Sequence, residues 1–411
     1  MDANLPTYRR ANLALFLIAR FLATTAIHMQ GVAVGWQVYD LTGDPLDLGL
    51  IGLAQFAPFV PLVLIAGHLA DRWNRKRIIA SCYLVEMCCA LALAWLSTRG
   101  INDVWPVLAV LAVHGATRAF MMPATQAILV DIAPGDAFAR AVALSSSSFQ
   151  LAVIVGPALG GGLYLAGAAT VYAVVAGLLA LSCVMLGFAR VHRPRCPPSS
   201  LNWQSLSEGV RFVVTRPTVF GAISLDLFAV LFGGATALLP AYARDVLGIG
   251  PSGLGLLRMA PAVGAALMAA ALVYRPLSRR LGRRMFDGVF LFGAATVVFA
   301  LSRDFTVSFL ALVLIGIGDM LSVYVRHNLI QLSTPDAIRG RVSAVNAIFI
   351  GASNELGEFE SGLSAAWLGL VPALLAGGVV TLLIGMLWMH WFPALRQMDR
   401  FPHDMRSGKR P

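Results

Sequence analysis

The sequence carries little charge for its length. Only 13% of its 411 residues are charged, whereas soluble domains carry roughly 25%, so an ordinary soluble fold is excluded. Its five cysteines form no CxxC pair, which favours buried packing over a metal or redox role. No HExxH, nucleophile-elbow or Walker motif occurs, so neither hydrolytic nor ATP-driven chemistry is indicated. We therefore expect no cofactor, no metal and no enzymatic activity.

Apolar residues are abundant instead, at 58% of the chain, and they stand in long runs. A bilayer leaves exposed backbone groups without water, so each crossing needs about 20 apolar residues in a helix or else a closed barrel. The alternating strands of a barrel are absent from the sequence. We predict an all-α membrane protein with twelve transmembrane helices, at 13–37, 47–68, 79–98, 104–126, 141–165, 170–190, 218–241, 252–274, 285–302, 306–328, 343–366 and 370–391.

Basic residues set the orientation of these spans. With the N-terminus inside, only Arg99, Arg244 and Arg303 of the residues outside the spans fall on the outer side. The positive-inside rule therefore predicts a multi-pass protein of the bacterial inner membrane with both termini cytoplasmic. The net charge of +10 sits in short inner loops, which favours membrane lipid over nucleic acid as the basic residues' counterpart. We expect a monomer.

The chain divides into two halves of six helices. We predict an N-terminal bundle at 1–190, a cytoplasmic linker with an amphipathic helix at 191–217, a C-terminal bundle at 218–395 and a tail at 396–411. Matching basic loops recur in the two halves, from Gly67 to Arg77 and from Arg275 to Met285. Parallel six-helix repeats are how one group of transporters places its substrate site between two moving halves.

The first of these loops, GHLADRWNRKR, resembles the signature loop of the major facilitator superfamily. That resemblance implies the fold of the family and a conformational latch formed by Gly67, Asp71, Arg72, Arg75 and Lys76. An ordinary positive-inside loop would explain the basic run, although not the spacing of the glycine and the aspartate. The second half departs from the pattern, because arginines stand where the first half has Gly67 and Asp71.

A glycine and proline motif in the fifth span is similar to one that marks exporters within the superfamily. It comprises Gly156, Pro157, Gly160 and Gly161, and an earlier family glycine is missing. Proline removes a backbone donor and glycines allow close packing, so a structural kink is the alternative explanation. Two further stretches, at 238–265 and 339–362, resemble the branch that includes the enterobactin exporter and macrolide efflux pumps.

Ionisable residues inside spans are costly, at roughly 2.5–3.5 kcal/mol each at mid-bilayer, and therefore point to function or pairing. The first helix carries a stripe of polar and small residues that we expect to face the cavity, namely Arg20, Thr24, His28, Gly31 and Gly35. Arg118 resembles the intramembrane arginine of the family, and we interpret Glu86 as a packing acid. The candidates for lining the substrate cavity are Arg20, Thr24, Trp36, Arg118, Phe228 and Arg326.

The second half supplies the acids. Glu355 and Glu358 share one helix face, whereas Glu360 points roughly opposite. Neighbouring carboxylates in a low dielectric favour proton binding, and pairing with arginines would explain the same residues. The candidates for proton coupling are Asp226, Glu355, Glu358, Asp319 and His28.

The sequence thus predicts a secondary active transporter that exports a small molecule, such as a siderophore, a drug or an amphiphilic metabolite, by alternating access and proton antiport. An importer or facilitator of a metabolite or lysolipid with the same fold is the alternative. A membrane enzyme or sensor is disfavoured, because no catalytic motif supports it.

Overall fold

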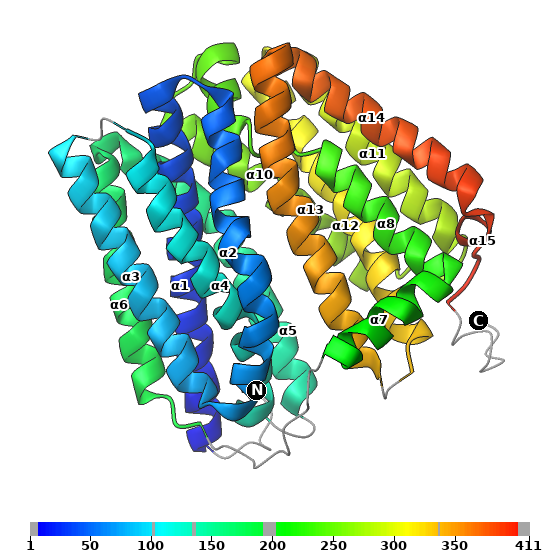
Figure 1. The fold of residues 1–411 in the computed structure, drawn as a ribbon, viewed down its shortest axis with the longest axis horizontal. Coiled ribbons are helices and arrows are strands. Elements are labelled where there is room, and N and C mark those ends of the chain that lie inside the picture. Colours follow the sequence, from blue (N-terminus) through cyan, green and yellow to red (C-terminus); the bar gives the residue numbers. More distant parts are fainter. Residues whose placement is uncertain (1–6, 101–102, 134–136, 192–202, 336–337, 402–411) are drawn as a thin grey trace. The chain divides into compact units, whose positions relative to one another are not determined.

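The computed structural model describes residues 7–100, 103–133, 137–191, 203–335 and 338–401, and within these ranges every regular element is helical (Figure 1). The long helices of the N-terminal part are α1 (Thr7–Thr42), α2 (Pro45–Arg72), α3 (Arg75–Arg99), α4 (Trp105–Ile132), α5 (Ala137–Leu163) and α6 (Ala168–Phe188). Those that follow are α7 (Trp203–Thr215), α8 (Pro217–Phe232), α10 (Pro251–Tyr274), α11 (Leu281–Leu301), α12 (Phe305–Ser333), α13 (Arg339–Leu368) and α14 (Leu370–Trp391).

Most of these helices are long and apolar enough to cross a bilayer. Ten meet that standard among the described residues, and the bent pair formed by α7 and α8, with an angle of 102°, makes an eleventh. The helix α13 has 30 residues and is also long enough. It does not meet the standard for apolar character, and it contains Glu355, Glu358 and Glu360. Eleven of the twelve spans expected from the sequence correspond to one long helix each, and the seventh corresponds to the shorter α8.

The seventh span differs from its prediction. The sequence predicts a continuous helix over 218–241, but α8 ends at Phe232 and the chain turns at Gly233. A three-residue helix α9 (Leu239–Ala241) and a π-helical turn at Tyr242–Val246 follow. Two adjacent glycines lower helix propensity by about 1 kcal/mol each relative to alanine, and that is enough to stop the helix within an apolar run.

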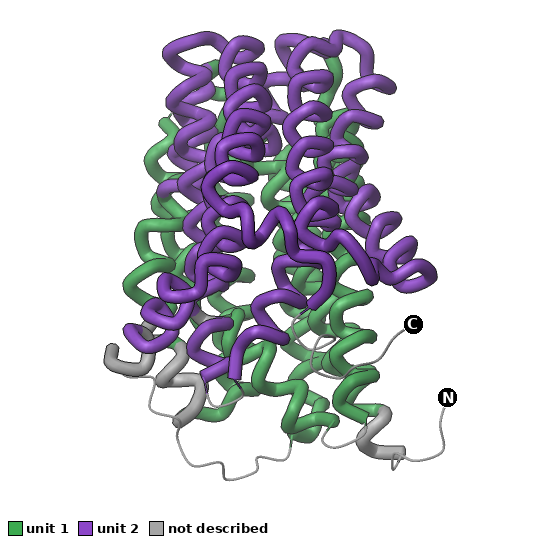
Figure 2. The backbone as a smooth tube through the Cα atoms, turned by 90° about the vertical axis from the view of Figure 1, so that its right-hand side faces the viewer, with its two compact units in different colours: residues 1–43, 54–200, 249–259 green, residues 44–53, 201–248, 260–411 purple. Residues whose placement is uncertain are grey.

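The helices form two compact units, coloured separately in Figure 2. Unit 1 comprises residues 1–43, 54–200 and 249–259, and unit 2 comprises 44–53, 201–248 and 260–411. Two helices, α2 and α10, therefore contribute to both units. The domain boundaries expected from the sequence at 190 and 218 remain a prediction. In the structure, the first turns of α2 belong to unit 2 and the first turns of α10 belong to unit 1.

Glycines allow the helices of unit 1 to approach closely. A Cβ on Gly156 would meet Thr25 and His28 of α1, and one on Gly160 would meet the backbone of Met29. The sequence motif that contains Pro157 is therefore the face on which α5 packs against α1, and α5 continues through the proline as one helix. This packing positions the polar residues of α1 against α5.

The core of unit 2 lies among α8, α11, α12 and α14. Its buried members include Met285, Phe286 and Trp388. The amphipathic helix α7 packs on α13, where Val213 is buried in a second cluster and Gly209 lies against the backbone of Arg341. An ion pair between Arg341 and Glu208 holds the two helices together at their edge.

Candidate functional site

The polar stripe of α1 faces α5. Arg20 donates a hydrogen bond to Ser145, and its guanidinium lies 5.5 Å from the centre of the Phe149 ring. His28 meets the same ring edge-on, with 6.5 Å between the ring centroids. Two residues of the stripe that was expected to face the cavity, Arg20 and His28, therefore contact α5. Phe149 provides a cation–π and aromatic platform beneath the two ionisable groups.

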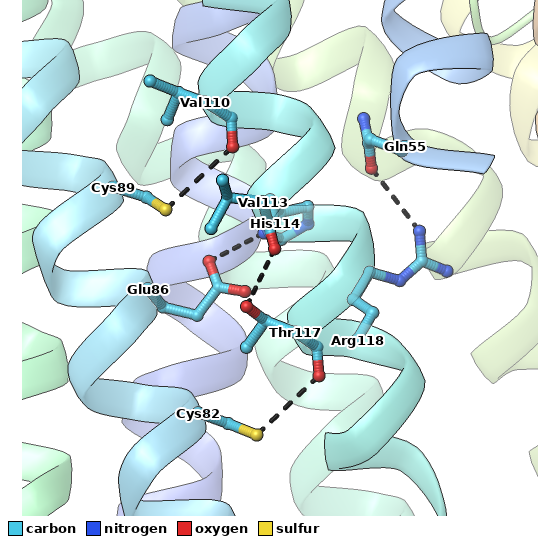
Figure 3. Close-up of polar contacts among 9 residues, drawn as sticks. All are labelled: Gln55, Cys82, Glu86, Cys89, Val110, Val113, His114, Thr117 and Arg118. Atoms are coloured by element: carbon cyan, nitrogen blue, oxygen red, sulfur yellow. Dashed lines mark hydrogen bonds and ion pairs between the residues drawn. The ribbon is translucent and has the colours of Figure 1, made fainter. Parts of the chain in front are cut away.

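A second arginine lies on α4 and faces α2. Arg118 Nη1 is 3.5 Å from Gln55 Oε1 (Figure 3), and its guanidinium is 5.8 Å from the centre of the Phe59 ring. The backbone of α2 comes close here because Gly115 has no side chain, and a Cβ there would overlap the Gln55 carbonyl. Arg118 thus joins α4 to α2 through its contacts with Gln55 and Phe59.

Glu86 and His114 form a buried pair between α3 and α4 (Figure 3). His114 Nδ1 is 2.7 Å from Glu86 Oε2, and the two side chains are 1% and 7% exposed, in the order Glu86 and His114. On either side, the thiols of Cys82 and Cys89 donate to helix carbonyls. The interpretation of Glu86 as a packing acid fits this position. Sequence reasoning did not single out His114, although its location in an apolar run was a signal.

Arg258 is a further arginine that sequence reasoning missed. It lies on the part of α10 that belongs to unit 1, and its Nη1 donates to the Gly31 carbonyl at 2.7 Å. The same segment packs tightly on α5, because Gly255 and Gly161 each lack a side chain at the crossing. Arg20, Arg118 and Arg258 thus place guanidinium groups on α1, α4 and α10 of unit 1.

The predicted latch is described only in part. The side chains of Gly67, Asp71 and Arg72 lie outside the described residues. Arg75 pairs with Asp131 at 2.9 Å and also donates to the Ala127 carbonyl. Lys76 donates to the carbonyls of Gly187 and Ala189 at the end of α6, at 2.6 and 2.7 Å. These two residues of the loop therefore fasten α3 to α4 and α6 within unit 1.

In unit 2, Asp226 of α8 and Arg326 of α12 form an ion pair. Both are buried, with 6% and 4% of their surfaces exposed. Helical spacing places Arg326 on one face of its helix with Asp319, but its partner in the structure is the acid on α8. Two charges that are buried away from water stabilise each other, because neither has water as an alternative partner.

The other acids that the sequence nominates for proton coupling in unit 2 are Asp319, Glu355 and Glu358. Asp319 makes no hydrogen bond or ion pair with any other residue that the structure describes. Glu355 is buried, while Glu358 lies against Gly52, where a Cβ would come within 2.9 Å of its carboxylate. The same Cβ would meet the backbone carbonyl of Glu355 at 2.8 Å, so both residues lie where α13 meets α2.

Glu360 lines a cavity of about 170 Å³ at the break in α8. The cavity walls include Gly233 and Gly234 at the break and the hydroxyl-bearing Ser361 and Ser364 on α13, and none of the lining residues is basic. The last carbonyls of α8 also lack intrahelical donors. Sequence reasoning assigns this acid the least weight, because it points away from Glu355 and Glu358 on the helix. The break that creates its cavity is not predicted.

The expected cavity residues Thr24, Trp36 and Phe228 separate into two groups. Thr24 and Trp36 are partly buried on α1. Phe228 instead packs on Trp388, with 5.3 Å between the ring centroids, and belongs to the border of the unit 2 core. No cluster of three or more potential metal ligands of the His, Cys, Asp or Glu type occurs in the described part of the chain.

Bundles of helices that are long and apolar enough to cross a bilayer define an integral membrane protein. The chain belongs to the Major Facilitator Superfamily, whose family model matches residues 16–358. It is 28% identical to the multidrug efflux pump Tap of Mycolicibacterium fortuitum, over 95% of this chain and 98% of that protein. It is 26% identical to the enterobactin exporter EntS of Escherichia coli, over 96% and 95% of the two chains.

Solved structures agree on the fold. A bacterial homologue of the human lysosomal transporter Spinster, in an inward-facing and unoccupied conformation, has a TM-score of 0.76 at 15% identity, over 96% of this chain and 99% of that one. The nucleoside transporter NupG has a TM-score of 0.70 at 15% identity, over 93% and 99%. The resemblance to this superfamily, and to its efflux pumps and exporters, is thereby confirmed, and the protein is a multi-pass membrane transporter.

Proposed function

We propose that this transporter exports a small molecule by alternating access, in exchange for protons. The observation that carries the proposal is the presence of carboxyl groups without a basic partner inside membrane helices. Asp319 has no described partner, and the cavity around Glu360 contains no basic side chain. An uncompensated carboxylate is costly in this environment and becomes neutral when it takes up a proton. Binding and release of that proton can therefore favour one conformation over the other.

Export as the direction of transport is supported by the relatives and by α5. The names of Tap and EntS describe an efflux pump and an exporter. The motif of Gly156, Pro157 and Gly160, which resembles that of exporters, forms the surface on which α5 meets α1. The substrate class we propose is a siderophore, a drug or an amphiphilic metabolite. Arg20 and Arg118, each beside an aromatic ring, would contact it.

We also propose that the protein sits in the bacterial inner membrane with both termini in the cytoplasm. The distribution of Lys and Arg among the loops supports this orientation. Protons would then enter from the periplasmic side, where the membrane potential and the pH gradient both favour inward movement. Substrate would leave by the same alternating path in the opposite direction.

Transport into inverted membrane vesicles tests the proposal. Vesicles that contain the protein should accumulate a fluorescent dye, a macrolide or a siderophore when a proton gradient is present, and collapse of the gradient by a protonophore should abolish accumulation. Accumulation that survives the collapse would contradict proton coupling. A deletion strain that lacks a compound, instead of hoarding it, would contradict export and favour the importer.

Two variants examine the acids directly. Asp319→Asn and Glu360→Gln each preserve shape and remove the titratable proton, so each should reduce gradient-driven accumulation strongly if its carboxyl carries the proton. Asp304→Asn is the matched control. Asp304 caps the start of α12 by accepting from the Val307 N–H, and asparagine caps a helix about as well. Normal coupled transport by both Asp319→Asn and Glu360→Gln would refute the assignment of these acids.

A further inference from the structure

A large groove runs between α3 and α4 in unit 1, and its walls include Cys82 and Thr117 beside the Glu86–His114 pair. Its volume is about 980 Å³, at the upper end of the roughly 300–1,000 Å³ typical of small-molecule sites. Its walls include Val85 and Val113, which are 38% and 45% exposed on helices that cross the membrane. The groove therefore opens on a surface that faces lipid chains.

One end of the groove is polar and the rest is apolar. Trp73, Asn74, Arg77 and Ser81 line the end next to the loop between α2 and α3. Trp73 is 61% exposed, and tryptophan is enriched at the level of lipid headgroups. Phe120 lies three residues beyond Thr117, whose carbonyl accepts from Cys82, and is therefore nearer the polar end. Further along, Ala116 and the two exposed valines form the apolar walls. An occupant of this shape has a polar head and a hydrocarbon tail.

The charge at the polar end comes from one residue of a basic run. Arg75 is engaged by Asp131, and Lys76 is engaged by the carbonyls at the end of α6. Arg77 is different, because its guanidinium makes no hydrogen bond or ion pair with any other described residue, while it lines the groove. Two of three consecutive cations thus fasten the helix bundle, and the third is directed to the groove.

We propose that this groove binds an anionic phospholipid, with its phosphate at Arg77 and an acyl chain along Val85, Val113 and Phe120. A guanidinium forms paired hydrogen bonds with phosphate oxygens, and the N-terminus of α3 adds a favourable dipole. The acyl chain would reach the level of the buried Glu86–His114 pair, because Val85 and Val113 directly precede these two residues in the sequence.

Native mass spectrometry of the purified transporter in detergent tests the proposal. The probes are phosphatidylglycerol and phosphatidylethanolamine with identical chains. We expect the wild type to retain phosphatidylglycerol preferentially, and Arg77→Ala to weaken its binding by about fivefold, as typical for one basic residue at a membrane surface. Ala116→Trp, which fills the groove, should abolish retention of the lipid. Thermal unfolding checks that both variants fold.

Arg99→Ala is the matched control, because Arg99 lies at the opposite end of α3 and stacks on Trp95. This variant should retain phosphatidylglycerol like the wild type. An equal loss in Arg77→Ala and Arg99→Ala would show general electrostatic attraction and overturn the site. Equal retention of both lipids by the wild type would overturn the anionic preference. Unchanged binding in folded Ala116→Trp would overturn the groove.

Discussion

The buried ion pair between Asp226 and Arg326 allows its structural and functional roles to be separated. Replacing Asp226 by alanine leaves a guanidinium buried in unit 2 without its partner. Breaking a buried pair costs about 3–5 kcal/mol, and the guanidinium cannot become neutral by losing a proton. The opposite variant, Arg326→Met, should cost less, since the carboxyl left behind can take up a proton. The two single variants are therefore expected to be unequally destabilised.

The double variant Asp226→Ala/Arg326→Met removes both charges. It should recover about 2 kcal/mol or more of the loss caused by Asp226→Ala alone, because no uncompensated charge remains. The free energy of unfolding in mixed detergent micelles measures this double-mutant cycle. A double variant no more stable than Asp226→Ala alone would refute the reasoning.

Transport by the same double variant then decides between two roles for Asp226. If the folded double variant still exports substrate in a proton-dependent manner, the pair is structural. If it folds but fails to couple transport to the gradient, Asp226 takes part in coupling, as the sequence left open. The ion pair itself is compatible with both, since a pair can also open and re-form between two conformations.

Three further outcomes are expected from the packing. Glu86→Ala leaves His114 without its acceptor and should lower the free energy of unfolding by about 1–3 kcal/mol, more than Glu86→Gln does; equal stability of the two variants would contradict the pairing. Gly115→Ala should destabilise the protein, because its Cβ overlaps the Gln55 carbonyl, whereas Gly177→Ala, which meets nothing within 4 Å, should stabilise it by up to about 1 kcal/mol; thermal unfolding in detergent compares them. Tyr242→Phe removes a hydroxyl whose single hydrogen is shared between the carbonyls of Phe299 and Ser302 and should cost about 1 kcal/mol, and a melting temperature equal to that of the wild type would contradict this contact.

The helical membrane fold follows from the sequence because an apolar run of about 20 residues satisfies its backbone hydrogen bonds in lipid by forming a helix. The break after Phe232 was not foreseen, although two adjacent glycines are a known interruption signal, because the run around them is apolar enough to be read as one span. The unpredicted break also affected the prediction of the proton-binding acids. Glu360 received little weight from helical geometry alone, and only the break gives it a cavity.

Pairings between distant residues were also beyond sequence reasoning. Asp226 and Arg326 lie on different helices, and the same arginine could equally have been assigned to Asp319 from spacing within its own helix. Arg258 and His114 were overlooked for a related reason. A polar residue in an apolar run indicates that a partner exists, but the helix that supplies the partner is fixed only by packing.

Proton movement by the purified transporter in sealed proteoliposomes is the most direct measurement of the central claim. With a pH-sensitive dye inside the vesicles, addition of a transported substrate on one side should move protons in the opposite direction, with the signal greatly reduced in Asp319→Asn or Glu360→Gln. Substrate flux with no accompanying change in internal pH would contradict proton exchange.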